Sequence, residues 1–215
     1  MSIFFASLFF VCAALAAAFA AIASAYTDFL YKENPAILSF PADIERRGRF
    51  RLPFLAVAFA LFLFATGLSA ANLPLFLFKN VVAIFMLVVI CTDFEQQVIF
   101  DKIMLPFVLL SLPFFLAGFL PVADHVLAAV LAGGAFLILA IITKGGIGGG
   151  DIKLIFALGL YFGSSKLLSI IICATVLGGF AAVFALLFGE TKRGEYIAYG
   201  PYFAATALLF AFLTH

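Results

Sequence analysis

Two groups of acidic residues stand out in a chain that is otherwise almost entirely apolar. Asp151 ends a glycine-rich run, and Asp93, Glu95 and Asp101 lie together in an earlier segment. Carboxyl groups are costly to place at a membrane boundary, so acids in such a chain are commonly functional. Two carboxyls brought close together share a proton and titrate as a unit. An ionised carboxyl can then take a proton from attacking water, while a neutral one hydrogen-bonds the scissile carbonyl.

Each acid also has an ordinary structural explanation. Asp151 could be the N-cap of a helix, and Asp93 could end a helix at the lipid headgroups. Asp101, followed by Lys102, has the pattern of a cap on the next helix. Glu95 is expected in a solvated turn. These alternatives stay open for each residue taken alone.

The composition indicates a membrane protein. Of 215 residues, 67% are hydrophobic and only 11% are charged, whereas a soluble domain carries roughly 25% charged residues. Apolar stretches of helix length recur along the whole chain, so the sequence predicts an all-α, polytopic transmembrane bundle in one membrane domain, residues 1–215. A net charge of +1 with no basic patch gives no indication of nucleic-acid binding.

The hydropathy pattern predicts about eight spans. They are expected at residues 3–25, 52–71, 74–92, 103–120, 124–143, 152–163, 167–188 and 199–214. The sixth is too short to cross a bilayer at about 1.5 Å per residue, unless the glycine-rich loop before it also enters the membrane. Irregular backbone survives at that depth only where protein or water satisfies it, as in a loop that forms a site.

Basic residues predict the orientation. With the N-terminus outside, the inside segments hold Lys32, Arg46, Arg47, Arg49, Arg51, Lys102, Lys144, Lys153, Lys192 and Arg193, and the outside segments hold only Lys79 and Lys166. This bias predicts that the acids face the cytoplasm, in a plasma (inner) membrane protein. The polar segment 26–51 is expected to be a cytoplasmic loop that binds anionic lipid headgroups or, alternatively, a substrate.

The glycines before Asp151 have a mechanical explanation. Residues 145–150 include five glycines, which permit positive φ angles and a close approach of backbone. An extended substrate could lie against Gly148, Gly149 and Gly150 as an added strand. Asp151 would sit near a helix N-terminus, which favours its ionised form. Glycines also serve in helix packing, and the run lacks the Gly-Lys-Ser/Thr ending of a phosphate loop.

Cysteine and histidine give no sign of a metal site. Cys12, Cys91 and Cys173 are isolated in apolar runs, and His125 and His215 are far apart in sequence. We therefore expect no metal and no cofactor.

Taken together, the motifs resemble those of the type IV prepilin leader peptidases, membrane aspartyl proteases of the Gly-x-Gly-Asp group. The run Gly148-Gly149-Gly150-Asp151, followed by Ile-Lys-Leu, matches that signature. The segment 93–101 is similar to the family's first aspartate block, with Ile-Phe where the family usually has Leu-Pro or Ile-Pro before the second Asp. A Gly-Pro pair at 200–201 resembles the element that opens the family's last helix. The resemblance covers residues 75–215.

The resemblance implies a function and a set of site residues. Asp93 and Asp151 would be catalytic, with Gly148, Gly149, Gly150 and Lys153 in the supporting loop and Glu95, Asp101, Gly200 and Pro201 as possible substrate contacts. The substrates would be type IV pilin or pseudopilin precursors, cut at the cytoplasmic face just before their hydrophobic helix. Their basic leader would find Glu95, Asp101, Glu190 and Glu195 nearby. Membrane lipid is the other expected partner.

The front of the chain departs from the larger family members. Those members carry paired Cys-x-x-Cys motifs in the first loop and N-methylate the new N-terminus, but this chain has no such motifs. We therefore expect a compact, peptidase-only form without N-methyltransferase activity. Three other functions remain open: a small proton- or ion-coupled transporter or channel, a non-catalytic subunit of a pilus or secretion machine, and a broader intramembrane protease.

Overall fold

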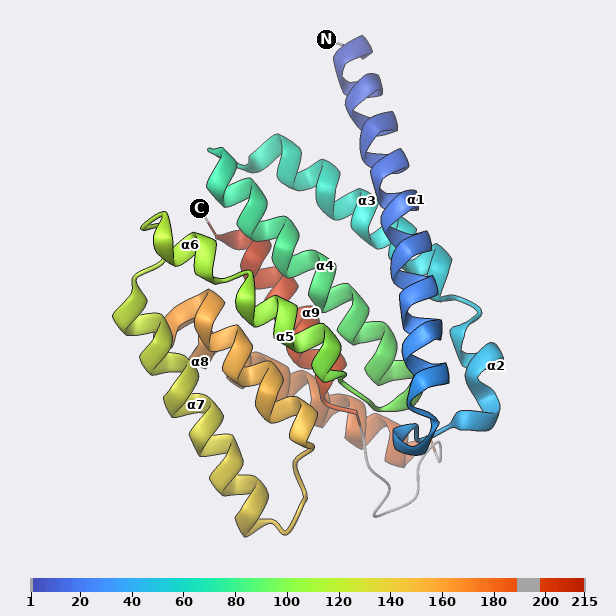
Figure 1. Ribbon diagram of the computed structural model, residues 1–215, viewed down its shortest axis with the longest axis vertical. Coiled ribbons are helices and arrows are strands. Elements are labelled where there is room, and N and C mark those ends of the chain that lie inside the picture. Colours follow the sequence, from blue (N-terminus) through green and yellow to red (C-terminus); the bar gives the residue numbers. More distant parts are fainter. Residues whose placement is uncertain (1, 189–197, 215) are drawn as a thin grey trace.

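The computed structural model describes residues 2–188 and 198–214. Those residues form helices and connecting segments, with no strand among them. The helices are α1 (Ser2–Glu33), α2 (Ile44–Gly48), α3 (Arg51–Ser69), α4 (Leu73–Gln96), α5 (Asp101–Leu109), α6 (Leu112–Leu116), α7 (Val122–Ile142), α8 (Gly149–Leu187) and α9 (Gly200–Leu213), with 3₁₀ turns at Pro35–Ile37 and Pro41–Asp43 between α1 and α2. Figure 1 shows them as one bundle with α4 in its middle.

The chain is a multi-pass helical membrane protein, as the composition predicts. Within the described residues, five helices are long and apolar enough to cross a membrane: α1, α3, α4, α7 and α8. Helix α9, with 14 residues, is apolar but shorter. Many large hydrophobic side chains on these helices are exposed, which fits surfaces that face lipid tails.

Several predicted boundaries are wrong. The predicted loop 26–51 begins later, because α1 continues to Glu33. The predicted span 103–120 is two short helices, α5 and α6, separated near Leu110, and Pro113 lies in the first turn of α6. Lys79 is not in an outside segment but is buried within α4, where its Nζ donates to the carbonyl of Phe212 at 3.0 Å.

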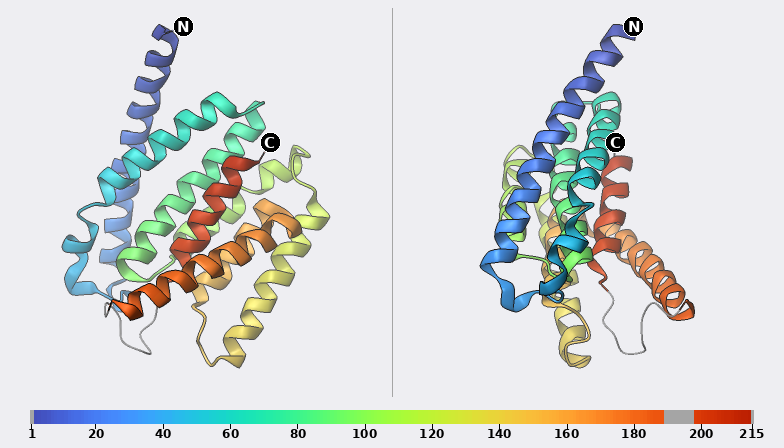
Figure 2. Two further views of the ribbon diagram at one scale, coloured as in Figure 1. Left: turned by 180° about the vertical axis from the view of Figure 1, so that it is seen from behind. Right: turned by 90° about the vertical axis from the view of Figure 1, so that its right-hand side faces the viewer.

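Helix α8 is two limbs joined at a sharp kink. Gly163 has φ 67° and ψ −178°, which is not helical. Figure 2 shows the chain reversing direction there. The kink falls where the sequence predicts a break, between 163 and 167. Asp124 on α7 holds the turn, since it accepts hydrogen bonds from the backbone N–H of Ser164 at 3.1 Å and from the Ser164 hydroxyl.

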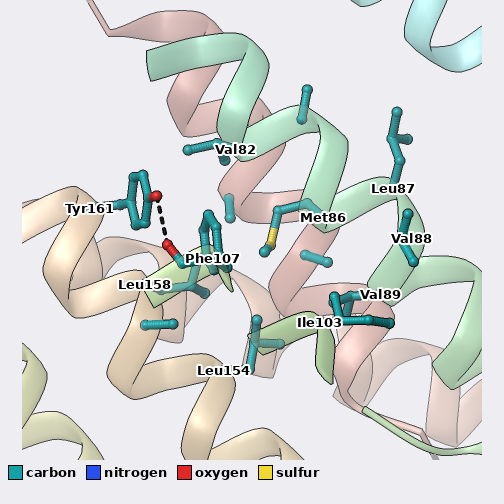
Figure 3. Packing of buried hydrophobic residues seen from close by; sticks show 14 of the residues in the cluster. Val82, Met86, Leu87, Val88, Val89, Ile103, Phe107, Leu154, Leu158 and Tyr161 are labelled. Carbon is teal, nitrogen blue, oxygen red and sulfur yellow. Dashed lines mark hydrogen bonds between the residues drawn. The ribbon is translucent and has the colours of Figure 1, made fainter. Parts of the chain in front are cut away.

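The core surrounds α4 and the first limb of α8. Figure 3 shows side chains of α4, α5 and α8 interdigitating. The rings of Phe107 on α5 and Tyr161 on α8 stack at 4.3 Å between centroids, and the Tyr161 hydroxyl donates to the carbonyl of Phe107 at 2.8 Å. That hydrogen bond satisfies the one polar atom of a fully buried ring. The packing fixes α5 against α8, and thereby fixes the two segments that carry Asp101 and Asp151.

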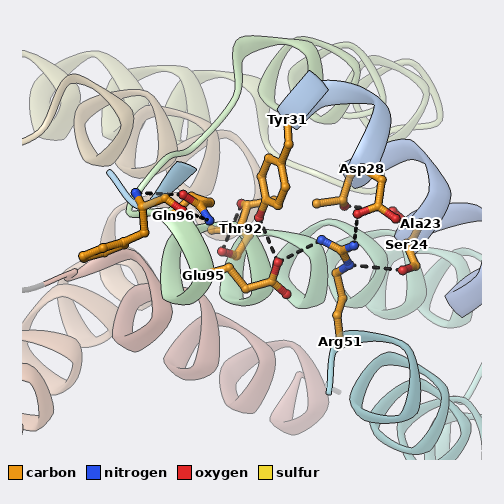
Figure 4. Close-up of polar contacts among 11 residues, drawn as sticks. Ala23, Ser24, Asp28, Tyr31, Arg51, Thr92, Glu95 and Gln96 are labelled. Carbon is orange, nitrogen blue, oxygen red and sulfur yellow. Dashed lines mark hydrogen bonds and ion pairs between the residues drawn. The ribbon is translucent and has the colours of Figure 1, made fainter. Parts of the chain in front are cut away.

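A buried charged network joins α1, α3 and α4 at one end of the bundle (Figure 4). Arg51, whose side chain is 4% exposed, pairs with Glu95 at 2.8 Å and with Asp28. Its Nε donates to the Ser24 hydroxyl at 3.1 Å, and the Tyr31 hydroxyl donates to Glu95 at 3.1 Å. The expectation that Glu95 lies in a solvated turn is therefore wrong: it is a buried residue of α4.

We expect Arg51→Met to destabilise the protein by about 3–5 kcal/mol, because it leaves the Glu95 carboxylate buried without its charge partner. Thermal or denaturant unfolding of the detergent-solubilised protein measures the change. Arg46→Met is the matched control, since Arg46 is exposed in the same segment and its replacement should change stability by less than about 0.5 kcal/mol. Equal stability of the two variants would contradict a structural role for this network.

Candidate active site

The predicted site residues converge at one end of the bundle. The C-terminal end of α4 and the N-terminal ends of α5, α8 and α9 lie together there, close to where α1 ends and α3 begins (Figures 1 and 2). Asp93 is in the last turn of α4, Asp101 is the first residue of α5, and Asp151 is in the first turn of α8. Three parts of the chain that are far apart in sequence therefore meet here: the turn from α4 to α5, the start of α8 and the start of α9.

Asp93 is held in a nearly closed environment. It is 5% exposed, and its Oδ2 is buried with no hydrogen-bond partner among the described residues. Helix α4 ends directly after it, because Gln97 adopts a left-handed conformation (φ 54°) and its N–H returns to the Asp93 carbonyl at 2.9 Å. An unpaired buried carboxyl oxygen is costly unless water or a ligand supplies the partner.

Gly200 forms the wall beside Asp93. A Cβ built on Gly200 would lie 2.5 Å from Oδ2 of Asp93 and 3.1 Å from Cδ1 of Ile99. Any side chain here would collide with the carboxyl, so only glycine leaves it room. Gly200 is also the first residue of α9 and precedes Pro201 in the first turn, where the fixed φ of proline suits a helix start.

Asp151 occupies the other side of the site. It lies in the first turn of α8, and its N–H donates to the carbonyl of Gly148, the N-cap residue, at 3.1 Å. A Cβ built on Gly148 would lie 3.3 Å from Oδ2 of Asp151. The N-terminal end of a helix carries partial positive charge, which favours a carboxylate at this position.

The two carboxyls line a single cavity. Its volume is about 210 Å³, and its lining consists of Asp93, Gln97, Val98, Ile99, Gly148, Gly149, Gly150 and Asp151. The charges of Asp93 and Asp151 interact across it. Because α4 and α8 each contribute one carboxyl to a space large enough for water, the arrangement suits general acid–base chemistry on a bound carbonyl group.

The loop glycines show both of the properties that the sequence predicts, but at different positions. Of the five, only Gly145 has a positive φ, at 91°, and Lys144 beside it is at 50°. Gly148 and Gly150 matter for close approach: a Cβ on Gly150 would lie 2.9 Å from Cβ of Ile99. Gly149 faces open space, with no atom within 4 Å of a built Cβ.

The remaining predicted residues lie around the cavity. Asp101 is not an N-cap: the cap of α5 is Phe100, and the Asp101 carboxylate pairs with Lys153 at 2.5 Å on the surface. Glu95 points into the network with Arg51, so its charge is already compensated. Glu190 and Glu195 lie outside the described residues. Among residues 2–188 and 198–214, no three His, Cys, Asp or Glu side chains gather as metal ligands would.

Sequence reasoning missed how firmly the end of α4 is held. The Gln96 side chain makes two hydrogen bonds to the backbone of Phe40, accepting from its N–H at 2.9 Å and donating to its carbonyl at 3.1 Å. The N–H of Ser39 donates to the backbone carbonyl of Gln96 at 3.2 Å. The connection between α1 and α2 thus braces the turn that carries Asp93. The only sign of these contacts in the sequence is the group of polar residues at 95–97, which follows a long apolar run.

Comparison with known proteins agrees with this geometry. The model of the type IV leader peptidase family matches residues 80–183, which include Asp93, Asp101 and Asp151. The chain belongs to the type IV leader peptidase family. The matched region excludes α1, α2, α3 and α9, so Gly200 and the Arg51 side of the charged network lie beyond it.

Three curated relatives of this family are each named prepilin leader peptidase/N-methyltransferase. The protein from Bacillus subtilis (strain 168) is 31% identical over 153 residues, which cover 68% of this chain and 60% of the relative. The protein from Neisseria gonorrhoeae is 34% identical over 115 residues, covering 51% and 39%. The protein from Aeromonas hydrophila is 30% identical over 121 residues, covering 52% and 41%. The chain therefore spans 60% of the first relative's length and about 40% of the other two. No solved structure matches it.

We expect Gly200→Ala and Gly150→Ala to destabilise this leader peptidase family member by about 1–3 kcal/mol, because each new methyl group overpacks the site. Gly149→Ala is the internal control, since its methyl group meets nothing and alanine favours the helix start, so stability should hold or rise slightly. The shift of the thermal unfolding midpoint measures all three. Equal midpoints for Gly200→Ala and Gly149→Ala would show that the close approach to Asp93 does not exist.

Proposed function

We propose that the protein is a membrane aspartyl endopeptidase that removes the leader peptide from type IV prepilin or pseudopilin precursors. The observation that carries the proposal is the shared cavity: Asp93 from α4 and Asp151 from α8 line it together. The family match and the names of the three relatives support the same reaction. We confine the proposal to the peptidase, because the chain has no paired Cys-x-x-Cys motif.

The two aspartates take different roles in this mechanism. Asp151, at the N-terminal end of α8, is the ionised base that removes a proton from water as the water oxygen bonds to the scissile carbonyl carbon. Asp93, buried with an unpartnered Oδ2, is the neutral acid that donates a hydrogen bond to the carbonyl oxygen as it gains charge. Collapse of the tetrahedral adduct breaks the C–N bond, and the leaving amine takes up the proton that Asp151 removed from the water. No covalent intermediate forms.

The glycine loop presents backbone to the substrate. Gly148 and Gly149 are exposed and line the cavity beside Asp151. An extended peptide can pair with exposed backbone as an added strand, which positions its own backbone without reading side chains. Such pairing would hold the scissile carbonyl between the two carboxyls, where correct orientation lowers the activation free energy.

We further propose that the site faces the cytoplasm in the inner membrane. Lys32, Arg46, Arg47 and Arg49 lie at or near the ends of α1 and α2, on the side of the bundle where the site lies. Lys166 lies beside the kink of α8, near the C-terminal end of α9, where its Nζ donates to the Thr214 hydroxyl at 3.1 Å. A surplus of basic residues on one side is typical of the cytoplasmic face.

We expect Asp93→Asn and Asp151→Asn each to reduce cleavage of a pilin-like precursor by at least about 1,000-fold. Asparagine at 151 cannot take the proton from water, and the amide at 93 is a much weaker acid than a carboxyl, so it stabilises the developing oxyanion less. Asp101→Asn is the matched control, since it removes a nearby surface carboxylate whose ion pair contributes little. It should keep at least about half of the wild-type kcat/KM. Precursor processing by purified protein in detergent or liposomes, followed by gel mobility and N-terminal sequencing, measures the rates.

Measurement of unfolding midpoints accompanies these assays, so that lost activity is not mistaken for lost folding. Substantial processing by a folded Asp151→Asn protein would refute the mechanism. A loss of activity in Asp101→Asn as large as in Asp93→Asn would show that the catalytic pair has been assigned wrongly.

A further inference from the structure

A second and larger hollow lies beside the candidate site, on the surface between α5 and α7. We name it the α5–α7 groove. Its volume is about 700 Å³, and it is lined by Asp101, Lys102, Met104, Leu105 and Val108 of α5, by Val130, Gly133, Gly134 and Leu137 of α7, and by Ile152, Lys153 and Phe156 of α8. Its lining residues thus come from α5, α7 and the first limb of α8, and Figure 1 shows where these helices lie in the bundle.

The groove has a charged end and an apolar length. Asp101, Lys102 and Lys153 belong to the first turns of α5 and α8, so they mark the end nearest the aspartates. All other lining residues are apolar or glycine. On α5 the groove extends from Asp101 to Val108, which is about 10 Å at 1.5 Å per residue, or two turns of a helix.

Two adjacent glycines on α7 shape one wall. A Cβ on Gly133 would lie 3.2 Å from Cβ of Phe156, so this glycine lets α7 pack closely on α8. A Cβ on Gly134 would have nothing within 4 Å, so this glycine leaves open space in the groove. Within a membrane, helices associate through close van der Waals packing, and small residues permit that approach.

The groove and the catalytic cavity are lined by residues that are neighbours in the chain. Ile99 lines the cavity and Asp101 lines the groove, and on α8 Asp151 lines the cavity while Ile152 lines the groove. On each of these two segments, the residue that lines the cavity and the residue that lines the groove are at most two positions apart. The ion pair between Asp101 and Lys153, at 2.5 Å, lies in the groove lining at this end. A chain that lay in the groove would therefore have one end close to the residues that flank the aspartates.

We propose that the α5–α7 groove holds the hydrophobic helix of the precursor, so that the residues just before that helix enter the cavity between Asp93 and Asp151. This inference rests on the proposed function. Its occupant follows from the adjacent linings of the two spaces, because a helix packed in the groove along α8 has its end beside the residues that flank the aspartates. The apolar lining of the groove matches the apolar helix.

Disulfide cross-linking tests the occupant without requiring cleavage. Cys173 is exposed and is first replaced by alanine, whereas Cys12 and Cys91 are buried. In this background, Gly134→Cys is combined with single cysteines along the precursor helix, in membranes that contain both proteins. Gly179→Cys is the matched control, because Gly179 is also the second glycine of a pair, is equally half-buried, and also has nothing within 4 Å of a built Cβ.

We expect Gly134→Cys to cross-link to precursor positions that share one helix face, with at least about tenfold more product than Gly179→Cys. Absence of cross-links, or equal cross-linking by both variants, would overturn the groove as the docking site and leave lipid as its occupant. If cross-links form but the wild-type protein cleaves nothing, the proposed peptidase function fails and the docking site stands.

A kinetic measurement provides the second readout. Gly134→Phe fills the groove, so the ratio of kcat/KM for the full precursor to kcat/KM for a short leader peptide should fall at least about tenfold. Gly179→Phe should leave that ratio at its wild-type value. An unchanged ratio in Gly134→Phe, with wild-type unfolding temperature, would contradict the proposal.

Discussion

The structure depends on one electrostatic constraint: two carboxyl groups share one cavity at the end of a membrane bundle, and among residues 2–188 and 198–214 neither forms an ion pair with a basic side chain. Asp93 and Asp151 line the same cavity, and Oδ2 of Asp93 has no hydrogen-bond partner in the described chain. Burying a carboxyl without a partner costs free energy, so the surrounding structure has to hold it there. Close glycine backbone achieves this on both sides, with Gly200 against Asp93 and Gly148 against Asp151.

The last residues of α4, Glu95 and Gln96, hold this end of the helix in place through their contacts with other segments. Glu95 is fixed by Arg51 and Tyr31, while the Gln96 amide holds the backbone of Phe40. These contacts tie the last turn of α4 to α1, to α3 and to the connection between them. The network and the proposed catalytic pair are neighbours on the same turn but differ in kind: Oε2 of Glu95 accepts hydrogen bonds from Arg51 and Tyr31, whereas Oδ2 of Asp93 has no partner among the described residues.

Much of the fold could be predicted from the sequence, because long apolar runs are typical of membrane helices. The helical bundle, the start of the last helix at Gly200 and the break in α8 near Gly163 follow from such runs and from glycine. The ends of α1 and α4 could not be predicted. A span predicted from hydropathy ends at the first polar residues, whereas these two helices continue through them to Glu33 and Gln96. Tertiary partners such as Arg51 and the backbone of Phe40 make those extra turns possible, and a single sequence does not reveal them.

The cavity also explains why a site of this kind needs glycine more than it needs additional catalytic groups. A space of about 210 Å³ exceeds the roughly 10–15 Å³ that one water centre requires, and its two carboxyls and exposed backbone offer the two to four partners that a water needs. Water can therefore reach both aspartates, and apolar Val98 and Ile99 complete the lining. A larger side chain at Gly148, which lines the cavity, would occupy part of this space, and one at Gly200 would collide with the Asp93 carboxyl. In the proposed reaction a water and an amide must meet between the two carboxyls, so that reaction would require the free volume that these glycines leave.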